Sequence, residues 1–367
     1  MTEHYKLFGS EMSLYTGKVR SYLKKKGLTY EEVLSTITVY KNFIIPRTGV
    51  RFVPVLQTPD DLVLQDTTVI VDELESRHPD NSIYPATPKQ HLTALLIETY
   101  AEEWLVIPAM HYRWNFPQQN DKFIYSEFGR VVLPKAPAFV RAWVGKKIGA
   151  KFKAKVPLLG INDDTISAIE ASYVRLLHDL QAHFEQHNYL LGSRPCVADF
   201  GLIAPLYAHL YRDPAPGKLM KKHAPAVAKW VRRMIDDEPA LSKGALLSDD
   251  QVPDTLLPIL QRMAKEQLPV LKDTDKLLSQ WRKDNPDRKD IERAIGYHDF
   301  TVEGIRGQRV VLPYSLWMFA RSVNYYQSLD DTSAVDALLS DAGFANGLSE
   351  PLENRLARPN NILCFAQ

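Results

Sequence analysis

The sequence predicts a small α/β domain at the N-terminus, followed by a longer and mostly helical chain. Residues 7–26 have the pattern of a strand, a polar loop and a helix, and residues 51–77 that of two short strands and a helix. From residue 88 onwards, apolar side chains recur mainly at helical spacing. Because 367 residues are too many for one average domain, we expect three parts, at 1–86, 87–249 and 250–367.

The first predicted helix follows a short polar loop and ends at Gly27, which supplies a C-terminal stop. Lysines 24–26 lie in its last turn, where cations offset the helix dipole. Its expected apolar face consists of Val19, Tyr22 and Leu23. The loop carries Ser13-Leu14-Tyr15-Thr16, which is spaced like the Cys-Pro-Tyr-Cys of glutaredoxins but contains no thiol.

The second unit contains Val53-Pro54-Val55-Leu56 at the start of a strand. A proline cannot donate a ladder hydrogen bond, so it marks a bulge, an edge or a cis turn, or serves the fold alone. Here it would free the Val53 backbone to pair with an extended ligand. A turn at 59–61 leads to a strand at 62–64, and a helix from Asp66 buries Ile70, Val71 and Leu74. Together the two units predict a thioredoxin-like domain.

The middle of the chain is predicted to be helical. Residues 91–116 form a long amphipathic segment with an expected kink at Pro108. The insert 120–160 has a basic cluster, which we interpret as a solvated lid or linker rather than a nucleic-acid or membrane patch. Two helices follow within 163–211. His183 and His187 there have zinc-like spacing, but lack a third ligand and are expected on an exposed polar face.

The last part of the chain is expected to be ordered. Two helices separate near Pro269, glycines 304 and 307 suggest a small hairpin, and a helix stops at Gly343. No catalytic pattern emerges from its polar residues, so its role stays open between covering a cleft, mediating assembly and binding a partner.

Charge and cysteine content narrow the function classes. The net charge of +1 predicts no global attraction to nucleic acid or to a membrane. The N-terminus is polar and does not resemble a signal peptide, and no apolar run reaches membrane-spanning length. Cys196 and Cys364 match no metal or redox spacing, so we expect no metal and a cytoplasmic location.

These motifs resemble the cytosolic glutathione transferases over residues 1 to about 240. The resemblance rests on 13–20, on 53–56, on Gln65-Asp66-Thr67-Thr68-Val69-Ile70, and on Tyr189-Leu190-Leu191-Gly192 before Ala198-Asp199-Phe200. It implies a thioredoxin-like glutathione-binding domain, an all-helical second domain and, here, a mostly helical extension. It also implies a homodimer, glutathione as co-substrate, and detoxification of small electrophiles.

The resemblance places Ser13 at the catalytic position of zeta and omega members, which implies a serine-type enzyme. The rival hydroxyl donors are Ser10 and Tyr15. A thiol has a pKa near 8.5 and reacts as thiolate, so lowering that pKa by two units needs roughly 2.7 kcal/mol. One charge-assisted hydrogen bond contributes about 1.5–3 kcal/mol. Serine can donate that bond, whereas it cannot form a mixed disulfide, so a reductase is nearly excluded.

The resemblance also implies the other contacts. The γ-glutamyl carboxylate would bind the helix start at Asp66 and Thr67, with Asp66 as partner for the amino group or as a simple helix cap. Tyr15, Tyr112 and Arg113 are candidates for the electrophile pocket, although aromatic residues at this spacing also suit a core. The cations available for the glycyl carboxylate, on or beside an expected loop at 39–52, are Lys41, Arg47 and Arg51.

Two further expectations complete the prediction. The helix-start box of the family is Ser/Thr-x-x-Asp, but this chain has Cys196 at the cap, so Ser193 is the alternative cap and Asp199 is expected to be structural. The leading function is a glutathione transferase. The alternative is a non-catalytic binding protein on the same fold.

Overall fold

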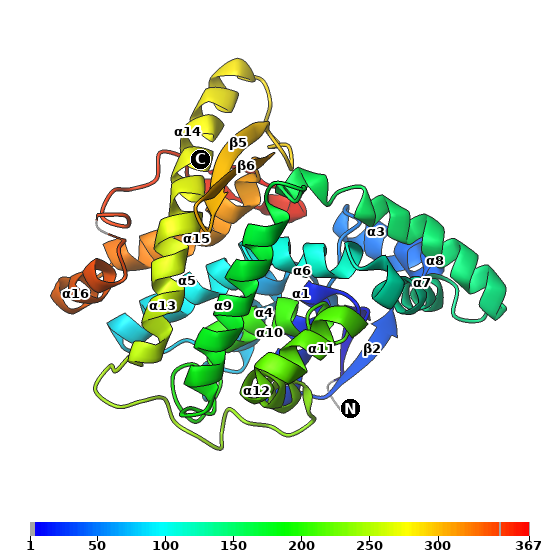
Figure 1. The fold of residues 1–367 in the computed structure, drawn as a ribbon, viewed down its shortest axis with the longest axis horizontal. Helices are drawn as coiled ribbons and strands as arrows, with labels where there is room; N and C mark the ends of the chain where they lie inside the picture. The colour runs from blue at the N-terminus through cyan, green and yellow to red at the C-terminus, as the bar shows by residue number, and fades with distance from the viewer. Residues whose placement is uncertain (1–3, 345, 367) are drawn as a thin grey trace. The chain divides into compact units, whose positions relative to one another are not determined.

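A computed structural model describes residues 4–344 and 346–366 (Figure 1). The chain divides into two compact units. Each unit is assembled from three separate stretches of the chain. The first comprises Met1–Ile83, Ala109–Val156 and Asp199–Gly244. The second comprises Tyr84–Pro108, Pro157–Ala198 and Ala245–Gln367. The division into three parts at residues 86 and 249 stays a prediction.

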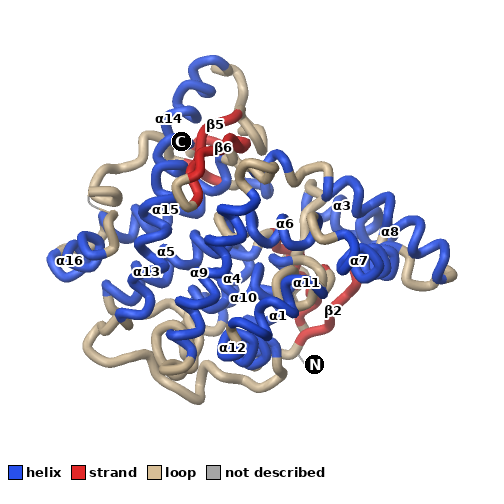
Figure 2. The backbone as a smooth tube through the Cα atoms, viewed as in Figure 1, coloured by secondary structure: helices blue, strands red, loops and turns tan. Residues whose placement is uncertain are grey.

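The first unit contains a four-stranded sheet in the order β2–β1–β3–β4, drawn in red in Figure 2. β1 pairs in parallel with β2 and antiparallel with β3, and β3 pairs antiparallel with β4. A parallel pair needs a crossover, which α1 supplies. The strand bounds are β1 Tyr5–Gly9, β2 Tyr30–Leu34, β3 Val55–Gln57 and β4 Val63–Gln65. The predicted thioredoxin-like domain is confirmed.

Helix α1 (Leu14–Lys26) has the apolar face that its sequence predicts. Val19, Tyr22 and Leu23 are fully buried, and Gly27 caps the helix at a φ of 78°. The lysines of its last turn do not all face solvent, because Lys25 is buried, where its ammonium pairs with Asp236.

The expected loop at 39–52 is largely helical, which corrects the prediction. Its elements are α2 (Ile37–Val39), a π-helical turn (Tyr40–Ile44) and α3 (Ile45–Thr48). Thr36 begins this segment by accepting a hydrogen bond from the Val39 N–H at 3.2 Å. Pro46 lies inside this continuous helical run, shortly after the π-helical turn, and Gly49 ends the run at a φ of 73°. Helix α4 (Thr67–Arg77) follows β4 and buries Ile70, Val71 and Leu74 as predicted.

The predicted kink near Pro108 is present as a break between two helices. α5 ends at Glu103 and α6 begins at Val106, so the break includes Trp104, the residue whose carbonyl a proline at 108 cannot bond. The insert expected as a solvated lid or linker forms an antiparallel helix pair, α7 and α8 (Figure 1). Its role as a lid stays a prediction. The helices that contribute mainly to the first unit are α6 Val106–Trp114, α7 Pro117–Val132, α8 Ala138–Lys153, α10 Val197–Ala208, α11 Pro214–His223 and α12 Pro225–Ile235.

The second unit joins the C-terminal extension to α5 and α9. Arg321 on α15 pairs with Glu98 on α5 at 2.8 Å, and the Gln267 amide donates to the Thr99 carbonyl at 3.2 Å. The major helices are α5 Pro88–Glu103, α9 Ile166–Phe184, α13 Leu257–Arg262, α14 Leu268–Asp284, α15 Pro313–Gln327 and α16 Ser333–Asp341. Shorter elements are η2 Pro157–Leu159, η3 Asp254–Leu256, the π-helical η4 Met263–Gln267 and η5 Pro359–Asn361.

The strand elements of the second unit are two hairpin-like pairs. β5 (Tyr297–Val302) and β6 (Ile305–Val310) turn at Glu303 and Gly304, both at positive φ, as the predicted hairpin requires. β7 (Leu356–Ala357) pairs with β8 (Cys364–Phe365). The helix before Gly343 lies where the sequence predicts it. The expected separation near Pro269 is absent, because the chain stays helical from Leu257 to Asp284 through the π-helical η4.

Two expectations for the helical chain need correction. His183 is buried rather than on an exposed face, with Nδ1 2.7 Å from the Thr255 hydroxyl and Nε2 3.2 Å from the Tyr189 carbonyl oxygen. Burial lowers its pKa to about 4. Ser193 bonds the Ala245 backbone, accepting from its N–H at 2.9 Å.

Asp199, expected to be structural, is fully buried and accepts a hydrogen bond from the Trp230 indole N–H at 3.1 Å. Across the described residues, no helix combines the length and apolar character needed to cross a membrane.

Candidate functional site

Three chain segments with chemical potential meet at one edge of the four-stranded sheet. β1 and β4 run parallel to each other and end at this edge, whereas β3 begins there. Ser13 follows β1, Pro54 immediately precedes β3 and Asp66 immediately follows β4. Helices α1 and α4 therefore both begin at this edge, so two positive dipole ends lie there. Such an edge suits an anionic ligand.

Ser13 is the N-cap of α1. Its backbone is extended, and its hydroxyl oxygen accepts a hydrogen bond from the Thr16 N–H at 3.3 Å. A hydroxyl can donate one hydrogen bond while it accepts another. Because the helix occupies the acceptor side of the Ser13 oxygen, its hydrogen remains available for an anion at the helix start. The half-buried position of the side chain leaves it in reach of a ligand.

The two rival hydroxyls differ from Ser13 in position. Ser10 is only 4% exposed and its carbonyl accepts from the Ser13 N–H at 3.2 Å, which closes the loop before α1. Tyr15 is half-buried in the first turn of α1. Ser13 therefore combines access with the cap position.

The Val53–Pro54 peptide bond is cis. Pro54 is buried and Val53 is half-buried. Within the part of the chain that the structure describes, the backbone N–H and carbonyl of Val53 make no hydrogen bond to protein. An extended ligand could satisfy both groups by strand-like pairing.

Asp66 has an unusual backbone at the start of α4. Its φ of 94° with ψ of 141° lies in a region that side chains other than glycine rarely occupy. The carboxylate accepts from the Thr68 N–H at 3.0 Å, so Asp66 is also the helix cap. Asp66 and Thr67 are 9% and 2% exposed, respectively. Strain retained at such a position favours a functional role over simple capping.

The candidate cations are not equivalent. Arg47 binds Asp61, with one guanidinium nitrogen 2.8 Å from the carbonyl oxygen and 3.1 Å from the carboxylate. Lys41 and Arg51 are exposed and have no ion-pair partner among the residues described. Lys41 follows β2, which ends at the same sheet edge, and Arg51 precedes Pro54.

Tyr112 and Arg113, predicted for the electrophile pocket, are buried in the first unit. The Arg113 Nε lies 2.6 Å from one Asp213 carboxylate oxygen, and one Nη lies 2.8 Å from the other. The remaining bonds reach the Met12 carbonyl at 3.0 Å and the Ala208 carbonyl at 2.7 Å. These contacts favour a role for Arg113 in fixing the loop before Ser13, and the predicted electrophile contact remains untested.

Asp213 and His209 are the residues that sequence reasoning missed around this loop. Asp213 lies 100 positions from Arg113, so no local spacing signals the pair. His209 is buried beside Arg113 and its ring lies 3.2 Å from the Ala109 carbonyl oxygen. Burial and the nearby guanidinium hold its pKa well below the usual value.

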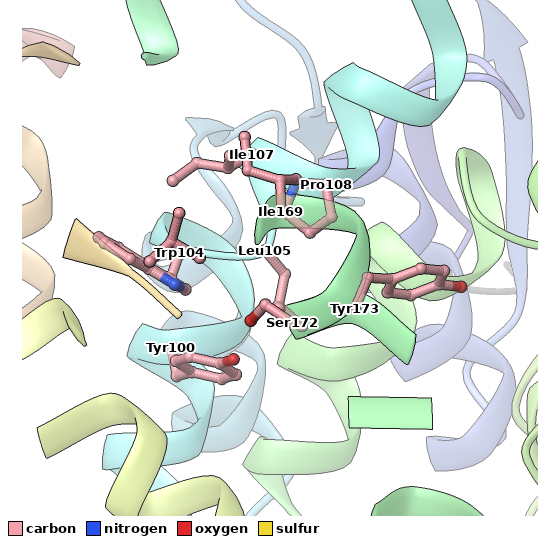
Figure 3. Close-up of a pocket in the computed structure, with 9 residues that line it drawn as sticks. Tyr100, Trp104, Leu105, Ile107, Pro108, Ile169, Ser172 and Tyr173 are labelled. Atoms are coloured by element: carbon pink, nitrogen blue, oxygen red, sulfur yellow. The ribbon is translucent and has the colours of Figure 1, made fainter. Parts of the chain in front are cut away.

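A small cavity of about 10 Å³ lies in the second unit, lined by side chains of α5, α6, α9 and β5 (Figure 3). Tyr100, Trp104, Ser172 and Tyr173 are among these side chains. A cavity of this size has room for about one water molecule, so it is not a substrate site. Among the described residues, no cluster of three or more His, Cys, Asp or Glu side chains could hold a metal ion.

Comparison with known proteins identifies the N-terminal part. Residues 7–82 match the family described as glutathione S-transferase, N-terminal domain. No curated protein matches the chain.

Solved structures with detectable similarity include three bacterial proteins. A glutathione S-transferase from Rhodospirillum rubrum F11 is 15% identical, with a TM-score of 0.43 over 68% of this chain and 96% of that one. The beta-etherase LigF from Sphingobium sp. strain SYK-6 is 19% identical, with a TM-score of 0.43 over 66% and 98%. A glutathione S-transferase from Methylobacterium radiotolerans, in complex with glutathione sulfonate, is 19% identical, with a TM-score of 0.40 over 68% and 100%.

These structures are too distant to assign residues or an activity. The family match and the β2–β1–β3–β4 sheet agree with each other, since both concern the segment that contains Ser13, Pro54 and Asp66. Residues 7–82 thus form a thioredoxin-like domain that matches the glutathione S-transferase N-terminal family.

Proposed function

We propose that this chain is a serine-type glutathione transferase, which binds glutathione at the edge of the four-stranded sheet. The observation that carries the proposal is the meeting of Ser13, Pro54 and Asp66 at that edge. Each of these three segments can bind a different chemical group of glutathione. The Val53 backbone pairs with the peptide groups, the start of α4 accepts the γ-glutamyl carboxylate, and the Asp66 carboxylate takes the amino group.

Ser13 acts on the sulfur. Its hydroxyl accepts from Thr16 and donates to the glutathione thiolate, while the dipole of α1 adds positive charge. One charge-assisted bond of about 1.5–3 kcal/mol lowers the thiol pKa by roughly one to two units. The thiolate then attacks an electrophilic carbon, a carbon–sulfur bond forms, and the leaving group departs with its electron pair or the electrons stay in an adduct.

The test is ultraviolet titration of the bound thiolate in wild type, Ser13→Ala and Tyr15→Phe. Ser13→Ala should raise the pKa of bound glutathione by roughly one to two units and leave the affinity for S-methylglutathione nearly unchanged, because the thioether has no thiolate to stabilise. Ser13→Cys should lose conjugation and form a mixed disulfide. A shift confined to Tyr15→Phe would move the role to Tyr15.

Turnover separates the transferase from the alternative binding protein. We expect glutathione conjugation with at least one member of a panel of aryl halides, epoxides and enones. Tight glutathione binding without a depressed thiol pKa in any variant would favour non-catalytic binding. The same proposal includes a homodimer in the cytoplasm, which the family resemblance supports. A mass that stays monomeric at every concentration in analytical ultracentrifugation would contradict the dimer.

A further inference from the structure

Helix α8 and the residues that flank it carry an excess of positive charge. Between residues 133 and 160 the chain has seven cationic side chains and no acidic one. They are Lys135, Arg141, Lys146, Lys147, Lys151, Lys153 and Lys155. The whole chain has a net charge of only +1, so the positive charge of this segment is offset by acidic side chains elsewhere in the sequence. The imbalance points to a local anionic partner.

Glycines determine which side of α8 packs against the protein. A Cβ at Gly145 would overlap the backbone carbonyl of Tyr125 on α7, and a Cβ at Gly149 would press on the Trp114 and Tyr125 rings. A Cβ at Gly129 of α7 would overlap the Arg141 carbonyl in the same way. The two helices therefore approach closely along the glycine side of α8 (Figure 1). Large side chains of α8 are left to the other side.

The outward face of α8 combines large aromatic side chains with lysines. At 3.6 residues per turn, 139, 143, 146, 147 and 150 share a face turned away from the glycines, and Lys153 lies beside that face, one turn after Gly149. Phe139 is 77% exposed and Trp143 is 60% exposed, while Lys146 and Lys153 are also exposed. The Lys147 ammonium lies 3.7 Å from the centre of the Trp143 ring. We call the face formed by Phe139, Trp143, Lys146, Lys147 and Lys153 the α8 face.

We propose that the α8 face binds the surface of an anionic phospholipid bilayer. Phenylalanine and tryptophan partition to the boundary between headgroups and acyl chains, and neighbouring lysines reach the lipid phosphates while their stems lie along the apolar surface. The α8 face presents both kinds of side chain, and no acid within 133–160 opposes the lipid charge. With 16 residues, α8 is too short to span a bilayer, so it lies in the interface plane.

The geometry favours lipid over nucleic acid. Unstacked bases bind by lying flat on aromatic faces along a basic groove. Here one face of the Trp143 ring is covered by Lys147, and Phe139 lies one turn away on a single helix, not in a groove. Trp143 and Lys147 suit the boundary between membrane and water, where an aromatic ring lies at the level of the headgroups and an ammonium lies beside it at the lipid phosphates. This proposal departs from the sequence prediction of no membrane partner, which rested on net charge.

The experiment is co-sedimentation of the full chain with vesicles of phosphatidylglycerol and phosphatidylcholine, against vesicles of phosphatidylcholine alone. Lys146→Glu/Lys153→Glu should weaken binding to the anionic vesicles at least about tenfold, because each exchange replaces an attraction to the lipid phosphates with a repulsion. Trp143→Ser should weaken it at high salt as well as at low salt. The matched control is Lys218→Glu/Lys222→Glu, two exposed lysines of α11 in the same unit, which should retain wild-type binding. Circular dichroism verifies that each variant is folded.

Trp143 also supplies a direct signal. The fluorescence difference between wild type and Trp143→Phe should shift to the blue when anionic vesicles are added, as the ring leaves water. Equal sedimentation with neutral vesicles, or equal loss in the α11 control, would overturn the proposal. So would a Trp143-dependent affinity for single-stranded RNA above that for vesicles, or a blue shift that follows protein concentration alone, which would mean that a second copy covers the face.

Discussion

Ser13 at the sheet edge and Arg113 on α6 differ in how many of their hydrogen-bonding positions are already occupied by partners inside the protein. At the sheet edge, the Ser13 oxygen accepts one bond from Thr16 and keeps its hydrogen for donation. On α6, Arg113 sends four hydrogen bonds to Asp213, Met12 and Ala208, which nearly exhausts the five donors of a guanidinium. A side chain with remaining capacity can serve a ligand, whereas one bonded throughout serves the fold.

The largest expected effect comes from breaking the Arg113–Asp213 pair. Arg113→Met should lower the free energy of unfolding by about 3–5 kcal/mol, because it leaves a buried carboxylate without its partner. Arg113→Met/Asp213→Leu should recover most of that loss, since neither charge then remains. Urea denaturation measures both variants.

Arg51→Met, which removes an exposed guanidinium, is the matched control and should change stability by less than about 0.5 kcal/mol. Unchanged stability in Arg113→Met, together with a raised KM for the electrophile, would restore Arg113 to the electrophile pocket and break the comparison.

The same distinction applies to His183 in the second unit. Burial is the main cause that lowers its pKa to about 4, against 6.5 for an exposed histidine. The folded state thus favours the neutral ring. The contribution of His183 to folding stability is therefore complete above pH 6.5 and is lost as the pH falls toward 4. The difference corresponds to about 3 kcal/mol.

The free energy of unfolding should therefore fall less steeply between pH 7 and pH 4 in His183→Asn than in wild type. His178→Asn, a variant of an exposed histidine on the same helix, should keep the wild-type slope. An unchanged slope in His183→Asn would show that His183 is not held neutral by the fold.

The sequence predicts the features at the sheet edge better than it predicts the buried pairs. The cap at Ser13, the proline before β3 and the start of α4 depend on short-range geometry, so local motifs predict them. Asp213 meets Arg113 across 100 positions, and Thr255 meets His183 across 72, which no local pattern encodes. The expected loop at 39–52 is helical up to Thr48, because the chain continues through the π-helical turn Tyr40–Ile44 and past Pro46 until Gly49 ends the run.

A smaller effect is expected at Asp66. Asp66→Asn should weaken glutathione binding about 10- to 100-fold, equivalent to about 1.5–3 kcal/mol, because the amino group loses its charged acceptor. Stability should hardly change, since asparagine caps helices as well as aspartate and tolerates positive φ.

Asp61→Asn is the matched control for titration calorimetry. Asp61 also has a positive φ, of 66°, but lies in the exposed turn before β4, so its replacement should leave affinity intact. A loss of stability in Asp66→Asn with full glutathione affinity would reduce Asp66 to a helix cap.

The smallest effects belong to the cations for the glycyl carboxylate. Lys41 and Arg51 are exposed, so each charge acts through water and salt, and removing either as Lys41→Gln or Arg51→Gln should cost about 0.2–1 kcal/mol of glutathione affinity. Arg47→Gln should cost less, because Asp61 already holds that guanidinium at 2.8 Å through its carbonyl. The effects should fade at about 1 M salt, where screening extends to about 3 Å. If Arg47→Gln is the variant that weakens binding, Arg47 must leave Asp61 to bind the ligand. A side chain that has a partner inside the protein could then also serve a ligand. That result would limit the comparison to buried pairs such as Arg113–Asp213, where no water competes for the bond.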